Sequence, residues 1–333
     1  MYTKSLRDLE EISDFIHPYS ESLRGKRIQI IGATGFVGRW LTESLIFHSN
    51  KYSLETRISC LGRTPIDVLQ SYVTNFKFNF QDPSSDYELA DLVFFAVTPS
   101  QPKTGGNQKD SVISSVDLGL RNLITRYCAS EKLVRFINCS SGAVQAIDSE
   151  LRLEGQNILK AAMEVDDLKE VYKNTKLLGE KLILDANHNN NFKGLNARLW
   201  TFYGFGISIN DHFAIGNFMK NAISRESILV KGNPETIRSY MYPTELVGAL
   251  VTAAFETESS TINIGSYEPI SIGSLAQLIA SEFDIKNVEY LDPKSEASSY
   301  FPEGSENSLT SNFNKVKISD GLQRWYSDLV NQN

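Results

Sequence analysis

The glycine-rich segment at residues 32–38 constrains the fold of this chain most strongly. Gly32, Gly35 and Gly38 have the spacing G-x-x-G-x-x-G, directly after the apolar run at 28–31 and before a stretch with helical periodicity. A strand, a tight glycine turn and a helix in this order are typical of dinucleotide-binding folds. The alternative is a tight turn that binds nothing. The residues expected to hold a pyrophosphate are Gly32, Thr34, Gly35, Phe36, Val37 and Gly38.

Strand-like and helix-like segments alternate from residue 27 to about residue 200. The expected strands are 28–31, 58–61, 76–80, 92–97, 134–138 and 195–200, and the expected helices are 39–47, 111–128 and 172–186. Alternation of this kind predicts an α/β fold with a doubly wound parallel Rossmann sheet, followed by a smaller C-terminal α/β substrate lobe. The elements expected after residue 200 are shorter: 213–224, 228–230, 244–255, 262–264, 274–283, 288–291 and a last helix around 322–329, with a surface loop at 292–311.

These patterns predict a three-part organisation. An amphipathic helical arm is expected at residues 1–24, because Leu6, Leu9, Ile12, Phe15 and Ile16 recur at helical spacing. The remaining parts are a Rossmann domain at 25–200, to which 239–265 return, and a nucleotide-sugar lobe made of 201–238 and 266–333.

Composition narrows the classes of partner. The 333 residues carry a net charge of −7, so there is no basic excess and nucleic acid is not expected to bind. The three cysteines and four histidines are scattered, which predicts neither a disulfide framework nor a metal site. No apolar run approaches the roughly 20 residues that cross a bilayer, and the first residues contain no apolar signal core. We therefore expect a soluble, cytoplasmic protein that does not bind membranes.

The end of the second expected strand bears on cofactor choice. NAD sites usually place a carboxylate there, bonded to the ribose 2′-hydroxyl. Here the strand runs into Gly62-Arg63-Thr64, and a guanidinium suits a 2′-phosphate. NADP(H) is therefore preferred, with NAD(H) as the alternative. A further possibility is that Arg63 stacks on adenine or faces solvent.

A second motif predicts redox chemistry. Tyr172 and Lys176 form Y-x-x-x-K, and residues four apart share one face of a helix. Lys176 is expected to lower the pKa of Tyr172, which would exchange a proton with a carbonyl or alcohol. Ser141, just after the strand expected at 134–138, is placed to hydrogen-bond the substrate oxygen. Ser141, Tyr172 and Lys176 are therefore the predicted catalytic residues.

With these motifs, residues 25–330 resemble the extended short-chain dehydrogenase/reductase family, in its nucleotide-sugar branch. Further matching segments are Gln81-Asp82, 140–144, 197–204, 238–243 and 262–266. The resemblance implies that Asp82 contacts adenine, that Ala96 lines the cofactor site and that Arg238 binds the nucleotide diphosphate. It also implies a homodimer, formed through the helices expected at 111–128 and 172–186.

The residues beside the serine favour one reaction of this branch. Dehydratases of the branch carry an acid and a base next to this position, and decarboxylases carry a glutamate where Ala143 stands. Gly142 and Ala143 cannot transfer a proton. Residues 211–218 with 140–144 and the N-terminal arm are similar to bacterial dTDP-4-keto-6-deoxyhexose reductases, which form sugars such as dTDP-fucose.

The resulting hypothesis is NADPH-dependent reduction of a 4-keto-(6-deoxy) nucleotide sugar, linked to dTDP or another nucleoside diphosphate, for bacterial surface polysaccharide biosynthesis. The alternatives are an NAD-dependent 4-epimerase and a non-catalytic NADP(H)-binding subunit. The residues expected to bind substrate are Thr98, Ser141, Asn217 and Arg238. For Thr98 a role in capping a loop is equally open, and for Arg238 a structural surface role.

Overall fold

The computed structural model describes residues 3–67, 69–77, 87–97, 108–145, 155–210, 213–302 and 316–331. Contacts divide the chain into two compact units: Met1–Leu199 with Leu250–Asn263, and Trp200–Ala249 with Ile264–Asn333. The functions that the sequence assigns to the two parts of the chain stay predictions.

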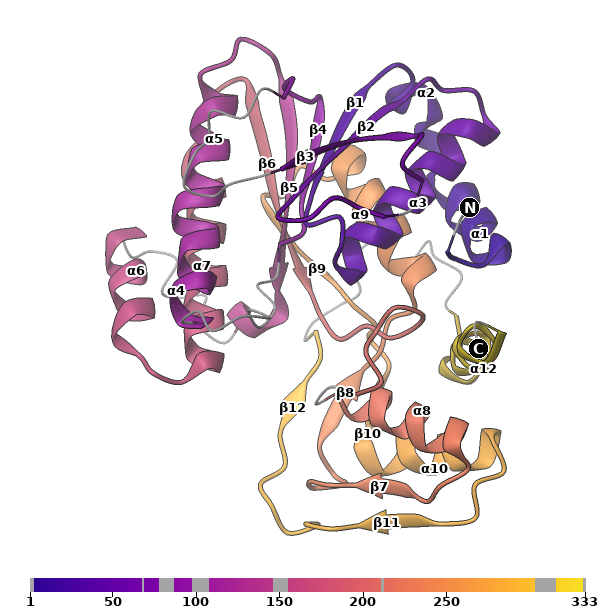
Figure 1. Cartoon of the computed structure of the whole chain (residues 1–333). Helices are drawn as coiled ribbons and strands as arrows, with labels where there is room; N and C mark the ends of the chain where they lie inside the picture. Colours follow the sequence, from indigo (N-terminus) through magenta and orange to yellow (C-terminus); the bar gives the residue numbers. More distant parts are fainter. Residues whose placement is uncertain are drawn as a thin grey trace. The chain divides into compact units, whose positions relative to one another are not determined.

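A seven-stranded sheet forms the centre of the first unit (Figure 1). Its strands are β1 (Arg27–Ile31), β2 (Arg57–Gly62), β3 (Val73–Lys77), β4 (Leu92–Phe95), β5 (Val134–Ser141), β6 (Phe192–Leu199) and β9 (Thr261–Ile264). The order is β3-β2-β1-β4-β5-β6-β9, and the strands from β3 to β6 pair in parallel. Strand order reverses between β1 and β4, where open α/β sheets bind ligands at the carboxyl ends of the strands. The predicted doubly wound α/β fold is confirmed.

Helices cover both faces of this sheet. They are α1 (Leu6–Ile16), α2 (Ser20–Leu23), α3 (Phe36–Lys51), α4 (Gln108–Ser114), α5 (Arg121–Cys128), α6 (Gly155–Glu164) and α7 (Leu168–Ala186). Figure 1 shows α5 and α7 along one face and α3 on the other. The core between the sheet and α7 consists of apolar side chains such as Phe95, Phe136 and Leu178, all at most 1% exposed. Burial on both faces is why these strands read as continuous apolar runs in the sequence.

The N-terminal arm packs on α3 through its apolar side. Leu9, Ile12 and Ile16 are fully buried, as the helical spacing predicts, whereas Leu6 is 64% exposed. Leu6 starts α1 directly after its cap Ser5 and lies on the solvent-exposed side of the helix. The prediction that Leu6 joins the apolar side is therefore wrong. Glu43 of α3 accepts hydrogen bonds from the backbone N–H groups of Thr3 and Lys4, which fixes the start of the arm.

Several element boundaries differ from those expected from the sequence. β5 continues to Ser141, so the serine ends the strand instead of following it. The helix expected at 111–128 contains a π-helical turn at Ser115–Leu120 between α4 and α5. α7 begins at Leu168, because the Asp167 carboxylate accepts a hydrogen bond from the backbone N–H of Lys169 and caps the helix. Helix α6 and the strands β8, β10 and β12 were not expected.

The second unit has its own core. Its elements are α8 (Ala214–Ser224), α10 (Ile272–Glu282), α12 (Ile318–Asn331), β7 (Ile228–Val230), β8 (Ile237–Ser239), β10 (Pro269–Ser271), β11 (Val288–Tyr290) and β12 (Ser299–Tyr300); α9 (Pro243–Glu256) begins here and ends in the first unit. The strands form a β10-β8-β12 sheet and a β11-β7 pair. Buried Tyr203, Tyr242 and Trp325 pack edge to face at the centre of the unit.

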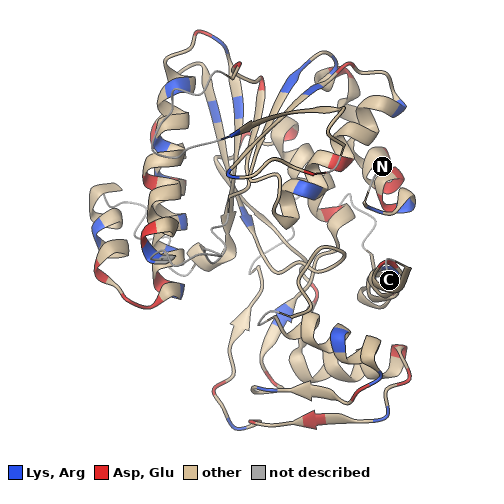
Figure 2. Cartoon of the chain, in the orientation of Figure 1, with Lys and Arg blue, Asp and Glu red and all other residues tan. Residues whose placement is uncertain are grey.

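Both signs of charge occur along the described parts of the chain. Figure 2 shows Lys and Arg residues interspersed with Asp and Glu on the elements of both units. None of the helices in these ranges combines the length and apolar character needed to cross a bilayer. The same ranges contain no group of three or more His, Cys, Asp or Glu side chains able to hold a metal ion.

Candidate functional site

Two glycines of the turn after β1 are required by the fold itself. Gly32 has a φ of +88°, and a Cβ there would lie 2.7 Å from the carbonyl oxygen of Ala96. A Cβ on Gly38 would collide with the carbonyl oxygen of Gly32, because the start of α3 lies directly on the turn. Replacing either glycine by a larger residue would place its Cβ against backbone atoms. Backbone atoms cannot move aside by changing rotamer, as a side chain could. The close approach also places Ala96, at the end of β4, beside the turn.

Gly35 has no such structural requirement. A Cβ on this residue would meet only the carbonyl oxygen of Gly32, at 3.4 Å, and both Thr34 and Gly35 are exposed. Gly35 is also the N-cap of the 16-residue helix α3, and it has no side chain that could accept from the first-turn N–H groups. A bare main chain at the positive end of a helix fits an anion such as a pyrophosphate. The dinucleotide assignment of this turn stays a prediction.

The turn after β2 presents a cation to solvent. Arg63 is exposed, and among the described residues no hydrogen bond or ion pair engages its side chain. Asp67, the first carboxylate after β2, pairs with Arg39 of α3. The nearest acid in sequence is thus already engaged, which leaves Arg63 as the group available at the end of β2.

Ser141 and Tyr172 are brought together as the motif predicts. Ser141 is buried at the end of β5, and its hydroxyl forms a hydrogen bond with the side chain of Tyr172 on α7. The Ser141 oxygen also accepts from the backbone N–H of Ala143, at 3.2 Å. The tyrosine ring is only partly buried, so the pair lies at the border between the protein interior and the space beyond the sheet edge.

Lys176 is held by main-chain carbonyls one turn further along α7. Its Nζ donates to the carbonyl oxygen of Cys139 at 2.8 Å and to that of Val97 at 3.2 Å, and it lies 5.8 Å from the centre of the Tyr172 ring. An ammonium has three protons, so one remains for a ligand. The two carbonyls anchor Lys176 between the ends of β4 and β5, a contact that the sequence motif did not predict.

Burial dominates the titration of both side chains. It raises the pKa of Tyr172 above its ordinary value, and the hydrogen bond from Ser141 opposes this shift. The prediction that the Tyr172 pKa is lowered is wrong, because loss of solvation outweighs the favourable contacts. Burial also lowers the pKa of Lys176 to about 8, opposed by electrostatic interactions with Cys139 and Glu180.

A buried polar cluster behind these residues was not identified from the sequence. Glu180, one turn beyond Lys176, accepts from Ser140 Oγ at 2.6 Å and from Arg198 Nε and Nη2 at 2.9 and 2.7 Å. The sequence does contain a signal for this cluster. Arg198 is a charged residue between the apolar Ala197 and Leu199 of a strand, and Glu180 follows Tyr172 and Lys176 at the same i+4 spacing.

Two predicted substrate-binding residues belong to the second unit. Arg238 of β8 donates from Nη1 to the carbonyl oxygens of Ile237 and Ser298 and from Nη2 to Ser298 Oγ, at 2.7, 3.1 and 3.1 Å. These bonds hold the guanidinium against the segment before β12. Asn217 is half-buried in the first turn of α8. Asp82 and Thr98 lie outside the described residues.

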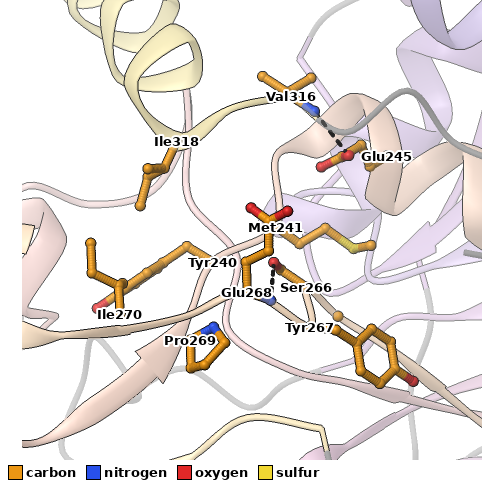
Figure 3. Close-up of a pocket in the computed structure, with 11 residues that line it drawn as sticks. Tyr240, Met241, Glu245, Ser266, Tyr267, Glu268, Pro269, Ile270, Val316 and Ile318 are labelled. Atoms are coloured by element: carbon orange, nitrogen blue, oxygen red, sulfur yellow. Dashed lines mark hydrogen bonds between the residues drawn. The ribbon is translucent and has the colours of Figure 1, made fainter. Parts of the chain in front are cut away.

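The second unit also contains a cavity of about 190 Å³, shown in Figure 3. Its wall includes Tyr240, Ser266, Tyr267 and Ile270. The Glu245 carboxylate beside it accepts from the backbone N–H of Val316 at 3.0 Å. None of the predicted site residues lines this cavity.

Comparison with curated proteins finds remote relatives. UDP-glucuronic acid decarboxylase 1 of Danio rerio is 22% identical over 256 residues, which are 77% of this chain and 60% of that protein. UDP-glucuronic acid decarboxylase 1 of Arabidopsis thaliana is 20% identical over 325 residues, which are 92% of this chain and 70% of that protein. The chain spans about three fifths of the length of the first of these relatives.

Solved structures share the fold. The UDP-glucuronic acid 4-epimerase of Bacillus cereus, in complex with UDP-glucuronic acid and NAD, superposes with a TM-score of 0.69 at 19% identity, covering 92% of this chain and all of that one (100%). WbmF of Bordetella bronchiseptica, in complex with NAD+ and UDP, superposes with a TM-score of 0.70 at 17% identity, covering 94% of each chain. The model of the NAD dependent epimerase/dehydratase family matches residues 28–265, from β1 to the end of β9. This match extends over most of the sequence and contains the glycine turn, Ser141, Tyr172 and Lys176, and the chain therefore belongs to the NAD dependent epimerase/dehydratase family.

Proposed function

We propose that this chain reduces a 4-keto-(6-deoxy) nucleotide sugar to the 4-hydroxy sugar nucleotide, with NADPH as the reductant. The observation that carries the proposal is the Tyr172 hydroxyl bonded to Ser141, with its pKa raised. A phenol that keeps its proton at neutral pH suits donation to an alkoxide, the proton transfer that a reduction needs. Gly142 and Ala143 beside the serine offer no group for elimination or decarboxylation.

The side chains divide the reaction among them. A nicotinamide cofactor, when bound, supplies the hydride that reduces the C4 carbonyl carbon. Ser141 donates a hydrogen bond to the carbonyl oxygen and stabilises the charge that develops on it. Tyr172 transfers its hydroxyl proton to this oxygen, which completes the alcohol. Lys176, anchored on two carbonyls, directs its remaining proton to the nicotinamide ribose and stabilises the tyrosinate that results.

The remaining site residues are proposed on the family resemblance. The main chain from Gly32 to Gly38 holds the pyrophosphate, and Ala96 and Asp82 complete the cofactor site. Arg63 binds the 2′-phosphate, and its exposed guanidinium, which no other described residue engages, supports this assignment. Arg238, Asn217 and Thr98 contact the sugar nucleotide, which carries dTDP or another nucleoside diphosphate. Two copies of the chain associate through α4, α5 and α7, and the product serves bacterial surface polysaccharide synthesis.

An NAD-dependent 4-epimerase is the second candidate. It needs the same serine, tyrosine and lysine and no further acid or base, and solved epimerases share this fold. The two reactions differ in redox balance, because an epimerase regenerates its cofactor whereas a reductase consumes one NADPH for each product.

The test is a panel of 4-keto-6-deoxy nucleotide sugars, UDP-glucose and UDP-glucuronic acid, each incubated with NADPH and, separately, with NAD+, the oxidant that epimerisation and decarboxylation need. We expect stoichiometric NADPH oxidation with one 4-keto sugar, and a product that is heavier by two hydrogens. Y172F should lower kcat by about 10²- to 10⁴-fold. Y72F, at an exposed tyrosine of the first unit, is the matched control and should retain full activity.

Other outcomes would contradict the proposal. Interconversion of sugars without net NADPH oxidation identifies the epimerase, and release of CO2 from UDP-glucuronic acid identifies a decarboxylase. Turnover near that of the wild type in Y172F removes the assigned proton donor. Thermal stabilisation by NADPH alone, with no response to any nucleotide sugar, favours a non-catalytic binding subunit.

A further inference from the structure

Glu180 is a carboxylate in the interior of the first unit. Its side chain is 0% exposed, and the guanidinium of Arg198 that it faces is 6% exposed. An isolated charge at such a position is very costly, and a buried pair is tolerated only when its remaining lone pairs and protons are also bonded. Here both carboxylate oxygens accept from Arg198, and Oε1 also accepts from Ser140. A buried ion pair of this kind contributes little to stability, so stability alone does not explain why the chain contains it.

The bonds of Glu180 join the three elements that carry the catalytic residues and their support. Glu180 belongs to α7, Ser140 to β5 and Arg198 to β6. The backbone adds a further link, because Asn196 Nδ2 donates to the carbonyl oxygen of Glu180 at 3.2 Å. Asn138 Nδ2 in turn donates to Asn196 Oδ1 at 2.9 Å. Helix α7 is thereby tied in rotation and in translation to the two strands beneath it.

The cluster of Glu180, Ser140 and Arg198 lies next to the residues that hold Tyr172 and Lys176. Ser140 stands between Cys139, whose carbonyl holds Lys176, and Ser141, whose hydroxyl bonds Tyr172. On α7 the order is Tyr172, Lys176 and Glu180, at four-residue spacing on one face. Three consecutive residues of β5 therefore contact three successive turns of α7, and the third contact is the bond between Ser140 and Glu180.

We infer that Glu180 is a positioning residue, which with Ser140 and Arg198 holds α7 in the register that places Tyr172 and Lys176 against Ser141, and which keeps the Lys176 ammonium charged. The inference rests on the proposed roles of Ser141, Tyr172 and Lys176. Its chemistry does not depend on which nucleotide sugar is the substrate.

The charge of Lys176 depends on the groups that face its side chain. These are Tyr172 and Glu180 on its own helix and Cys139 of β5, with the Val97 carbonyl at the end of β4. Burial lowers the Lys176 pKa toward neutrality, and the Glu180 charge works against this shift. Without Glu180 a larger fraction of the enzyme would hold a neutral amine, which binds the cofactor ribose less well and does not stabilise tyrosinate.

The experiment removes the charges without leaving one of them unpaired. In the double variant E180Q/R198M, glutamine retains an acceptor for Ser140 and methionine fills the space of the arginine. S140A removes only the strand–helix hydrogen bond and retains both charges. D185N is the matched control, because it removes a carboxylate from an exposed ion pair of the same helix, with Lys181. The wild type and each variant are compared in three measurements: thermal unfolding, the Lys176 titration and steady-state reduction.

The Lys176 titration needs no substrate. Protein labelled with ¹³Cε-lysine is titrated by NMR, with K176M assigning the resonance. We expect the Lys176 midpoint of E180Q/R198M to fall by roughly a few tenths of a pH unit, because the lost Glu180 charge favours the ammonium and the loss of Arg198 offsets only part of this effect. kcat should fall about tenfold through misplacement of Tyr172, while Tm changes by a few degrees. S140A should retain the midpoint and lose activity by a smaller factor, and D185N should change neither.

If the Glu180–Arg198 pair only stabilised the fold, the variants would give other results. If E180Q/R198M retains both the midpoint and kcat of the wild type, or if its loss of kcat is matched by D185N, the inference is overturned. If the double variant does not fold, S140A decides by itself, because full activity in S140A then contradicts the strand–helix tie. If the wild type reduces no nucleotide sugar, the proposed function fails, whereas the NMR midpoint still tests the link between Glu180 and Lys176.

Discussion

The glycine turn (residues 32–38) and the α7 site (Ser141, Tyr172 and Lys176) belong to the same unit, yet they are built in opposite ways. The turn would bind a ligand through its main chain, because the glycines that define it have no side chains. The α7 site works through side chains that come from separate strands and a helix. The turn is complete within seven consecutive residues, whereas the α7 site needs β4, β5, β6 and α7 to be assembled first.

The difference has a physical cause. A main-chain site needs only permissive conformations, and two of its three glycines are demanded by steric contact with backbone. A side-chain site buries polar groups, so each group needs partners of its own. Lys176 requires two carbonyls, and Glu180 requires Arg198 and Ser140. Local backbone conformation and the close approach of the Ala96 carbonyl therefore specify the turn, whereas a network of long-range hydrogen bonds specifies the α7 site.

The largest effect is expected from breaking the turn. G38A forces a methyl group into the Gly32 carbonyl, and we expect it to destabilise the chain by roughly 3 kcal/mol or more. G35A meets a single contact at 3.4 Å, so it should retain the unfolding midpoint and weaken NADPH binding about tenfold. Urea unfolding and calorimetric titration measure the two effects separately. Equal stability losses in both variants would show that the glycines are interchangeable and that Gly35 is not kept for a ligand.

A smaller effect is expected at the neighbouring end of β2. R63S removes the cation assigned to the 2′-phosphate, so the Kd for NADPH should rise about ten- to a hundredfold while the Kd for NADH changes little. R57S, at the exposed start of the same strand, is the control and should change neither constant. If R63S weakens both cofactors equally, Arg63 contacts a part that they share, and the preference for NADP loses its support.

The smallest effect is a pH dependence that separates the two sites. The Lys176 pKa is lowered to about 8, so Lys176 loses its charge as the pH rises through this value. NADH binding should then weaken up to about tenfold between pH 7.5 and 9.5, because an ammonium–ribose hydrogen bond is lost. ADP, which reaches only the turn, should bind equally over this range. K176R keeps its charge and should remove the alkaline loss.

The same proton has the opposite effect on stability. Above pH 8 the folded chain has released it while the unfolded chain, with an ordinary lysine, still binds it. Stability relative to K176M should therefore rise with pH over the interval in which NADH binding falls. Thermal unfolding of wild type and K176M at pH 7.5 and 9.5 measures this difference. A parallel fall in stability and binding would show that Lys176 is not the group that titrates.

Much of the fold could be predicted because its signals are local. The strands β1, β2 and β5 are apolar runs between turns, and α3 and α7 show helical periodicity. The predictions failed where tertiary contacts decide. β5 runs on to Ser141 because β6 pairs with it to the end, and Leu6, at the first position of α1, stays exposed. The short strands β8, β10 and β12 contain too few residues to show a period.

By itself, the sequence determined the parallel α/β order, the glycine turn, and the identity and order of the serine, tyrosine and lysine. These depend on residue type and on spacing along one chain, which local sterics translate directly into structure. Only the tertiary structure decided how the groups behave. It brought Cys139 and Val97 to Lys176, enclosed Glu180 with Arg198, and raised the Tyr172 pKa. Solvation and hydrogen bonding depend on neighbours that are distant in sequence, so no spacing of residues along the chain contains them.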